Sequence, residues 1–187
     1  MNFKMALENG LPPKKACFTI SMLEFPTAIT IDSAKYQRNG ELLNELVRLG
    51  LLTSKDTEAK AWAPFGLSAS ETKHPAKEYD LSEKGKLFVG KPKTGFSAMP
   101  GVSFCYGTYS IVDVVNFTEP ADYEGQKISK VQFTYKTTDI AEWVKESAIL
   151  QSNYNTIVKD LNSDKQPLEG KAVLVQTQKG WVIDKDM

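Results

Sequence analysis

The chain has 187 residues, 41% of them hydrophobic, and its 23 Lys and Arg residues balance 23 Asp and Glu residues. This composition excludes the collagen, coiled-coil and solenoid classes, and the length suits one or two domains with an ordinary hydrophobic core. Residues 31–90 carry nine basic and nine acidic side chains and residues 101–187 carry nine basic and twelve acidic ones, so neither half has the basic stripe that binds phosphate backbones and we do not expect nucleic acid as a partner. The sequence contains no run of about 18 apolar residues, so it predicts no transmembrane segment. The first residues, MNFKMALENG, do not have the pattern of an export signal.

The clearest element of the first half is a helix that Asp32 or Ser33 can cap and that Gly50 ends, because apolar residues between them recur at helical spacing. The stretch that follows, to about Pro75, is rich in polar and small residues and is interpreted as a long loop. The other expected elements are a short helix within residues 2–10, a strand at residues 17–20, a strand around residues 79–81 and a short helix capped by Ser82.

Residues 33–89 resemble a winged helix-turn-helix domain. The resemblance rests on LVRLGLL at 46–52, which ends the helix, and on the returning YDLSEKG at 79–85. It implies an intracellular DNA-binding regulator whose second half senses a ligand. Glu41 and Glu45 depart from the pattern, because a DNA-reading helix usually presents Arg, Lys, Asn or Gln to the bases.

The second half predicts a β domain with one long helix. Residues 102–117 form a β run, and KVQFTYKT at 130–137 alternates so that Val131, Phe133 and Tyr135 share the face on which a helix packs. A continuous apolar face predicts one helix from residue 139 to about 161, and Gln178-Lys179-Gly180 predicts a hairpin turn near the end. The predicted fold is α+β: a winged-helix-like domain over 1–90, a Gly/Pro-rich linker over 91–101, and an antiparallel sheet packed on one long helix over 102–187.

Cys17 and Cys105 both lie in strand-like segments, CFTI and FCYG. The residues alone leave three alternatives open: two separate buried thiols, one disulfide, or a Cys nucleophile. The nucleophile is disfavoured because it needs a base, and the one His, His74, lies in a polar, Pro-containing stretch.

No sequence pattern points to catalysis. Nucleotide-binding glycine loops, metalloprotease and serine-hydrolase motifs and paired CxxC sequences are absent from the sequence, so we assign no catalytic residue, metal or cofactor. Trp62 and Phe65 fall in the stretch interpreted as a loop, where exposed apolar side chains would form a candidate contact surface.

Nearly the whole chain is also similar to a group of uncharacterised bacterial cell-envelope proteins, many of them classed as lipoproteins. The resemblance rests on Cys17, the two motifs at 46–52 and 79–85, FCYG at 104–107, FTEP at 117–120, VQFTYK at 131–136, Trp143 and Gly180-Trp181. It implies a periplasmic protein with Cys17 and Cys105 bridged, an export signal that is not in this sequence, and a lipid anchor as one mode of attachment to the envelope.

These observations favour a non-enzymatic periplasmic protein that binds another protein or a small ligand. Two alternatives stay open: the intracellular winged-helix regulator, and an inhibitor or immunity protein that blocks a partner.

Overall fold

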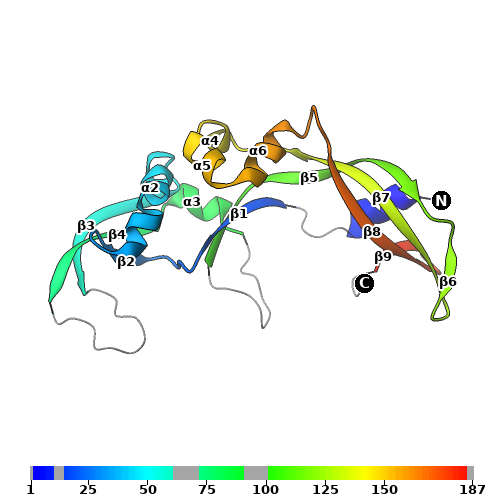
Figure 1. Ribbon diagram of the computed structural model, residues 1–187, viewed down its shortest axis with the longest axis horizontal. Helices are drawn as coiled ribbons and strands as arrows, with labels where there is room; N and C mark the ends of the chain where they lie inside the picture. Colours follow the sequence, from blue (N-terminus) through cyan, green and yellow to red (C-terminus); the bar gives the residue numbers. More distant parts are fainter. Residues whose placement is uncertain (1, 11–14, 61–71, 91–100, 185–187) are drawn as a thin grey trace. The chain divides into compact units, whose positions relative to one another are not determined.

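The computed structural model describes residues 2–10, 15–60, 72–90 and 101–184 (Figure 1). The chain divides into two compact units. Unit 1 comprises Met1–Ala16, Tyr106–Lys145 and Tyr154–Met187, and unit 2 comprises Cys17–Cys105 and Glu146–Asn153. Strands make up more of the described chain than helices in both units, and no described helix has both the length and the apolar character needed to cross a bilayer.

The core of unit 1 is an antiparallel sheet in the strand order β5-β7-β8-β9, with the short β6 paired to β7 (Figure 1). At the β8–β9 turn, Gly180 has φ 107°, a conformation that favours glycine, which confirms the predicted hairpin. The strands are β5 (Gly101–Phe117), β6 (Ala121–Tyr123), β7 (Gln126–Thr138), β8 (Leu168–Thr177) and β9 (Gly180–Ile183).

One face of this sheet is covered by helix α1 (Phe3–Gly10), which lies beside the strands in Figure 1. Its apolar side chains pack with alternate residues of β7 and β8, as the alternation of VQFTYK predicts. Phe133 is 2% exposed, and a Cβ at Gly170 would lie 2.3 Å from its ring, so β8 needs a glycine where this ring crosses it. The buried cluster consists of Phe3, Ala6, Leu7, Val131, Phe133 and Leu174.

Unit 2 contains a second antiparallel sheet, in the order β2-β4-β3, with helix α2 beside it. Ser33 caps α2 as expected, because its Oγ accepts a hydrogen bond from the Tyr36 amide, and Gly50 follows the helix with φ 75°. The elements are β2 (Thr27–Thr30), α2 (Ala34–Arg48), β3 (Leu52–Lys60), β4 (Lys73–Leu81) and α3 (Glu83–Phe88).

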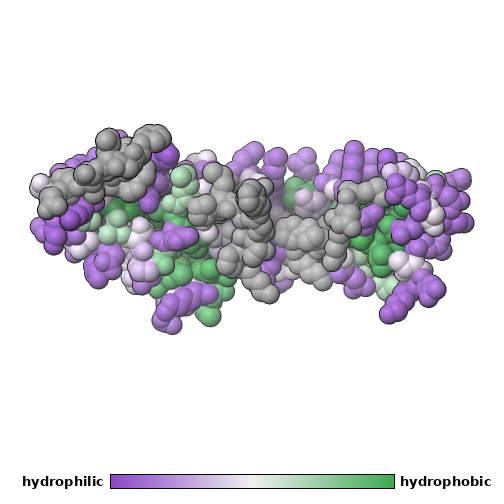
Figure 2. All heavy atoms as spheres, turned by 90° about the horizontal axis from the view of Figure 1, so that it is seen from below, coloured by the Kyte–Doolittle hydropathy of each residue, from purple (hydrophilic) through white to green (hydrophobic). Residues whose placement is uncertain are grey.

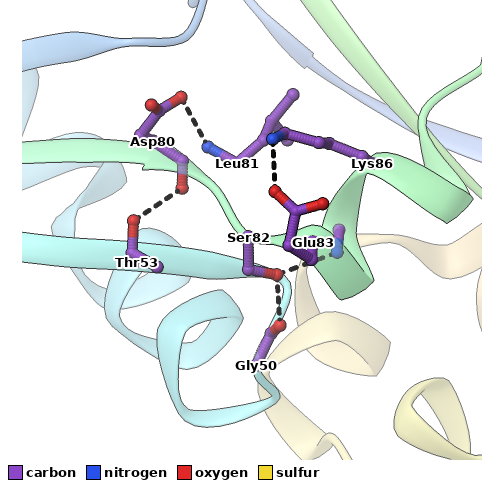
Figure 3. Close-up of polar contacts among 8 residues, drawn as sticks. Gly50, Thr53, Asp80, Leu81, Ser82, Glu83 and Lys86 are labelled. Atoms are coloured by element: carbon purple, nitrogen blue, oxygen red, sulfur yellow. Dashed lines mark hydrogen bonds and ion pairs between the residues drawn. The ribbon is translucent and has the colours of Figure 1, made fainter.

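Ser82 joins the end of β4 to the turn after α2 (Figure 3). Its Oγ donates to the Gly50 carbonyl at 2.6 Å and accepts from the Gly85 amide at 2.8 Å, so one hydroxyl caps α3 and fixes it to α2. A Cβ at Gly85 would lie 1.9 Å from the Leu51 carbonyl oxygen, so the close approach of the two segments requires glycine at this position.

Strand β1 (Lys15–Ser21) pairs with the beginning of β5. The Cys17–Cys105 disulfide joins the two strands, and the hydroxyls of Thr19 and Ser103 lie 2.7 Å apart. The residue numbers of these two pairs run in opposite directions, so the strands are antiparallel.

The predicted fold class is wrong in two respects. The helix expected over 139–161 is divided into three short helices, α4 (Glu142–Lys145), α5 (Ala148–Asn153) and α6 (Asn155–Asn162), of which α5 belongs to unit 2. The first break follows from Ser147, whose Oγ accepts from the Leu150 amide and so begins a new helix, and the second from Tyr154, which has extended backbone angles.

The prediction of a winged-helix-like first half is also wrong. Part of the stretch interpreted as a loop is strand β3, which pairs along its whole length with β4, and β1 belongs to the sheet that continues into the second half. The polar sequence of β3 has no strand pattern of its own. Hydrogen bonds to the neighbouring strand β4 make this segment a strand. The predicted linker at 91–101 lies outside the described residues except for Gly101, which begins β5.

Candidate functional site

The two cysteines form a disulfide, which confirms the pairing that the envelope resemblance implies. Both residues are half-buried, and the backbone of Gly90 lies against the bridge, because a Cβ there would be 2.8 Å from the Cys105 Sγ. No cysteine is free, so the alternative of a Cys nucleophile is excluded. Trp62 and Phe65, the candidate contact surface, lie outside the described residues.

A buried carboxylate, Asp160 on α6, accepts hydrogen bonds from two tyrosines of β5 in unit 1. The Tyr106 hydroxyl donates to Asp160 Oδ2 at 2.5 Å and the Tyr109 hydroxyl donates at 3.3 Å. The pKa of both tyrosines is raised well above its ordinary value near 10. Burial is the larger cause, and the adjacent Asp160 carboxylate is the next. Because Tyr106 and Asp160 are each 2% exposed, no substrate reaches them, and the cluster attaches α6 to the sheet.

Replacing Tyr106 with Phe is expected to lower the free energy of unfolding by about 1.5–3 kcal/mol, because a buried carboxylate loses a hydrogen-bond donor. Since the folded-state pKa is raised, the contribution of Tyr106 is complete below about pH 10, the unfolded value, and is lost as the pH rises further. Urea unfolding at pH 8 and pH 10.5 measures both effects. Tyr123→Phe, at a side chain that is 49% exposed, is the control, and equal losses in the two variants would contradict the assignment.

A second buried carboxylate, Glu45, holds α5 against α2 in unit 2. It forms a bidentate ion pair with Arg48, at 2.7 and 2.8 Å, and accepts from the Ser147 hydroxyl at 2.5 Å. The hydrogen bond from Arg48 is the main reason why the pKa of Glu45 is lowered, against the opposing effect of burial. Glu45 is 6% exposed, so this cluster is structural as well.

The remaining polar candidates do not form a reactive centre. His74 lies on β4 rather than in a loop, and its Nδ1 is 3.4 Å from the Asp32 carboxylate. Glu119, Asp122 and Glu124, which are close together in the sequence, are exposed, and nowhere in the described ranges do three His, Cys, Asp or Glu side chains gather closely enough to hold a metal ion.

The side chains of the unit 1 sheet that point away from α1 form the surface that we call the open face. Two rows across the strands define it. The register aligns Asn116, Gln132 and Lys171 in one row and Lys130 with Val173 in the next, where the Lys130 amide also bonds to Thr118 Oγ1.

The two rows border a hollow of about 380 Å³ that is open to solvent. The floor of the hollow is the row between them, formed by Phe117, Val131 and Ala172, whose side chains point toward α1. The hollow is lined by Asn116, Phe117, Thr118, Lys130, Val131, Gln132, Lys171, Ala172 and Val173.

The residues that line the hollow carry positive charge, and carboxylates lie at neighbouring positions of the same face: Glu169 two residues before Lys171, and Asp184 opposite Val173 in the row of Lys130. The lining itself contains two lysines and no carboxylate, and neither Lys130 nor Lys171 forms an ion pair within the described ranges. The Asn116 side-chain oxygen accepts from the Phe117 amide at 2.8 Å, which leaves its NH₂ group as a donor. The lysines are diagonal neighbours on adjacent strands, so their Cβ atoms are roughly 7–8 Å apart and both ammonium groups can reach one anion.

The sequence interpretation missed these residues. The alternation of KVQFTYKT places Lys130 and Gln132 opposite the buried aromatic face, which was a usable signal. Lys171 and Asn116 carry no such signal, because only the register brings them beside Gln132. No family model matches the chain, and neither the curated proteins nor the solved structures contain a match to it.

Proposed function

We propose that the protein is a non-enzymatic, extracytoplasmic binding protein that holds a small anionic ligand on the open face. The observation that carries this proposal is the hollow between two lysines that lack a carboxylate partner in the described chain. Gln132 lies beside both lysines and Asn116 lies beside Gln132 in the same row, so the lining offers amide hydrogen-bond donors and positive charge together. An anion is the ligand that satisfies both.

The periplasm or cell envelope is the proposed location. A disulfide persists in oxidising compartments and is rare in the cytosol, and the Cys17–Cys105 bridge supports this part of the proposal. Alkylation of free thiols followed by intact-mass measurement on protein from its native cells tests it. Two alkylated cysteines would overturn the extracytoplasmic location.

Titration of ¹⁵N-labelled protein with acetate, succinate and inorganic phosphate tests the binding site. We expect amide shifts concentrated on the two rows of the open face, and binding that weakens as salt is added. The double variant Lys130→Gln/Lys171→Gln should bind about tenfold more weakly or worse, because charge-assisted hydrogen bonds contribute about 1.5–3 kcal/mol.

Lys127→Gln is the matched control. This lysine is exposed on the same strand, but it lies three residues from Lys130 and therefore points to the other face of the sheet. Shifts scattered over both units, or an unchanged affinity in the double variant, would contradict anion binding at the open face.

A further inference from the structure

Two carboxylates lie on the open face beyond one end of the hollow. Glu169 precedes Lys171 by two residues on β8, so both side chains point to the same side of the sheet. The register aligns Glu169 and Asp113 with Thr134, in a row about 6.5 Å from the row of Lys171. Both carboxylates are exposed, and neither forms an ion pair within the described ranges. Negative charge therefore begins one row away from Lys171.

A third carboxylate lies beside the row of Lys130. The Asp184 amide donates to the Val173 carbonyl, so Asp184 lies opposite Val173, on the far side of β8 from Lys130. Adjacent strands are about 4.8 Å apart, so the backbones of Lys130 and Asp184 are separated by about 10 Å. None of the three carboxylates lines the hollow. The space between the two ammonium groups is therefore bordered by negative charge but not occupied by it.

Within the described ranges, the rows next to the lysines add no further positive charge. On one side is the row of Glu169 and Asp113, and on the other is the row of Ile128 and Val175, which is uncharged. Hydrophilic residues, purple in Figure 2, are spread along the whole surface, so an exposed lysine does not by itself define a site. What distinguishes the two lysines of the open face is that positive charge is confined to the hollow between them.

The positions of these charges limit the size of the anion that the open face can hold. An anion between the lysines interacts favourably with both ammonium groups. A second anionic group that extends by one row meets either the carboxylates of Glu169 and Asp113 or an uncharged row, so it gains no partner. Binding is therefore favourable only when all the negative charge lies close to the hollow.

We propose that the open face binds a compact anion whose negative charge lies wholly between Lys130 and Lys171, and that it does not bind extended polyanions. This inference rests on the proposed function and adds the class of ligand, a small carboxylate or oxyanion. Nucleic acids, polyphosphates and sulfated polysaccharides carry charge along their whole length, so the groups next to a bound one would lie against the carboxylates.

The first test is isothermal titration of the full chain with malonate and pimelate, each compared with its monoamide, which has the same length and one charge fewer. One methylene separates the carboxylates of malonate, so both lie near the lysines, whereas five methylenes separate those of pimelate. An ammonium group about 4 Å from the second carboxylate changes the affinity about fivefold in water. We expect malonate to bind more tightly than its monoamide by this factor, and pimelate to bind no more tightly than its own monoamide.

Glu169→Gln tests the carboxylate boundary without changing the lysines. It should raise the affinity for pimelate about twofold and the affinity for malonate less, because only the longer ligand reaches the row of Glu169. Glu41→Gln is the matched control, because it removes the same charge from an exposed position on α2 in unit 2. Circular dichroism verifies that both variants are folded.

The outcomes separate this inference from the proposed function. Tighter binding of pimelate than of its monoamide would overturn the compact ligand and leave the anion site standing, and so would tighter binding of tripolyphosphate or heparin than of malonate. Failure of acetate, malonate and inorganic phosphate to bind would overturn both. Equal effects of Glu169→Gln and Glu41→Gln on pimelate would show that only net charge matters and would overturn the carboxylate boundary.

Discussion

Loss of the Cys17–Cys105 disulfide is expected to lower the free energy of unfolding by about 4 kcal/mol. The bridge joins residues separated by 88 positions, and closing so long a loop removes many conformations from the unfolded chain. Domains of this size are stable by only about 5–15 kcal/mol, so the reduced protein should be close to unfolding at 37 °C. Urea unfolding of oxidised and reduced protein, at equal concentration and pH, measures the difference.

The double variant Cys17→Ala/Cys105→Ala is the control for this experiment. It should unfold at the urea concentration of the reduced protein and should not respond to reductant. Equal urea midpoints for oxidised and reduced wild-type protein would show that the pairing of β1 with β5 is stable without its covalent link.

Replacement of Phe133 by Ala is expected to cost about 3–5 kcal/mol, the usual range for a buried aromatic residue. The ring is 2% exposed, packs 6.0 Å from the ring of Tyr135 and occupies the space left by the missing side chain of Gly170. The neighbouring strands are fixed by their hydrogen bonds, so the cavity closes only in part. Chemical denaturation of the purified variant measures the loss.

Phe117→Ala provides the comparison, because this aromatic side chain is 50% exposed on the adjacent strand and contacts Phe3. It should cost less than half as much as Phe133→Ala. Equal costs would mean that the core between α1 and the sheet does not depend on Phe133.

Local sequence determined those elements whose signals lie within a few residues. The cap at Ser33 and the glycine at Gly50 set the ends of α2, and Gly180 set the β8–β9 turn, because each signal acts through backbone angles or hydrogen bonds of its immediate neighbours. The alternation around Phe133 likewise determined which face of β7 is buried.

Tertiary structure decided which segments meet, because pairing over long separations depends on hydrogen bonds that no local pattern encodes. The continuous apolar face over 139–161 predicts one helix, but Ser147 is used in contacts with Glu45 and α5 packs in the other unit. The register shift between Val114 and Asn116 in β5 places Asp113 and Asn116 on the same face, which strict alternation does not allow. The open face therefore follows from strand register: the sequence supplied its lysines, and the pairing of β7 with β8 brought them together.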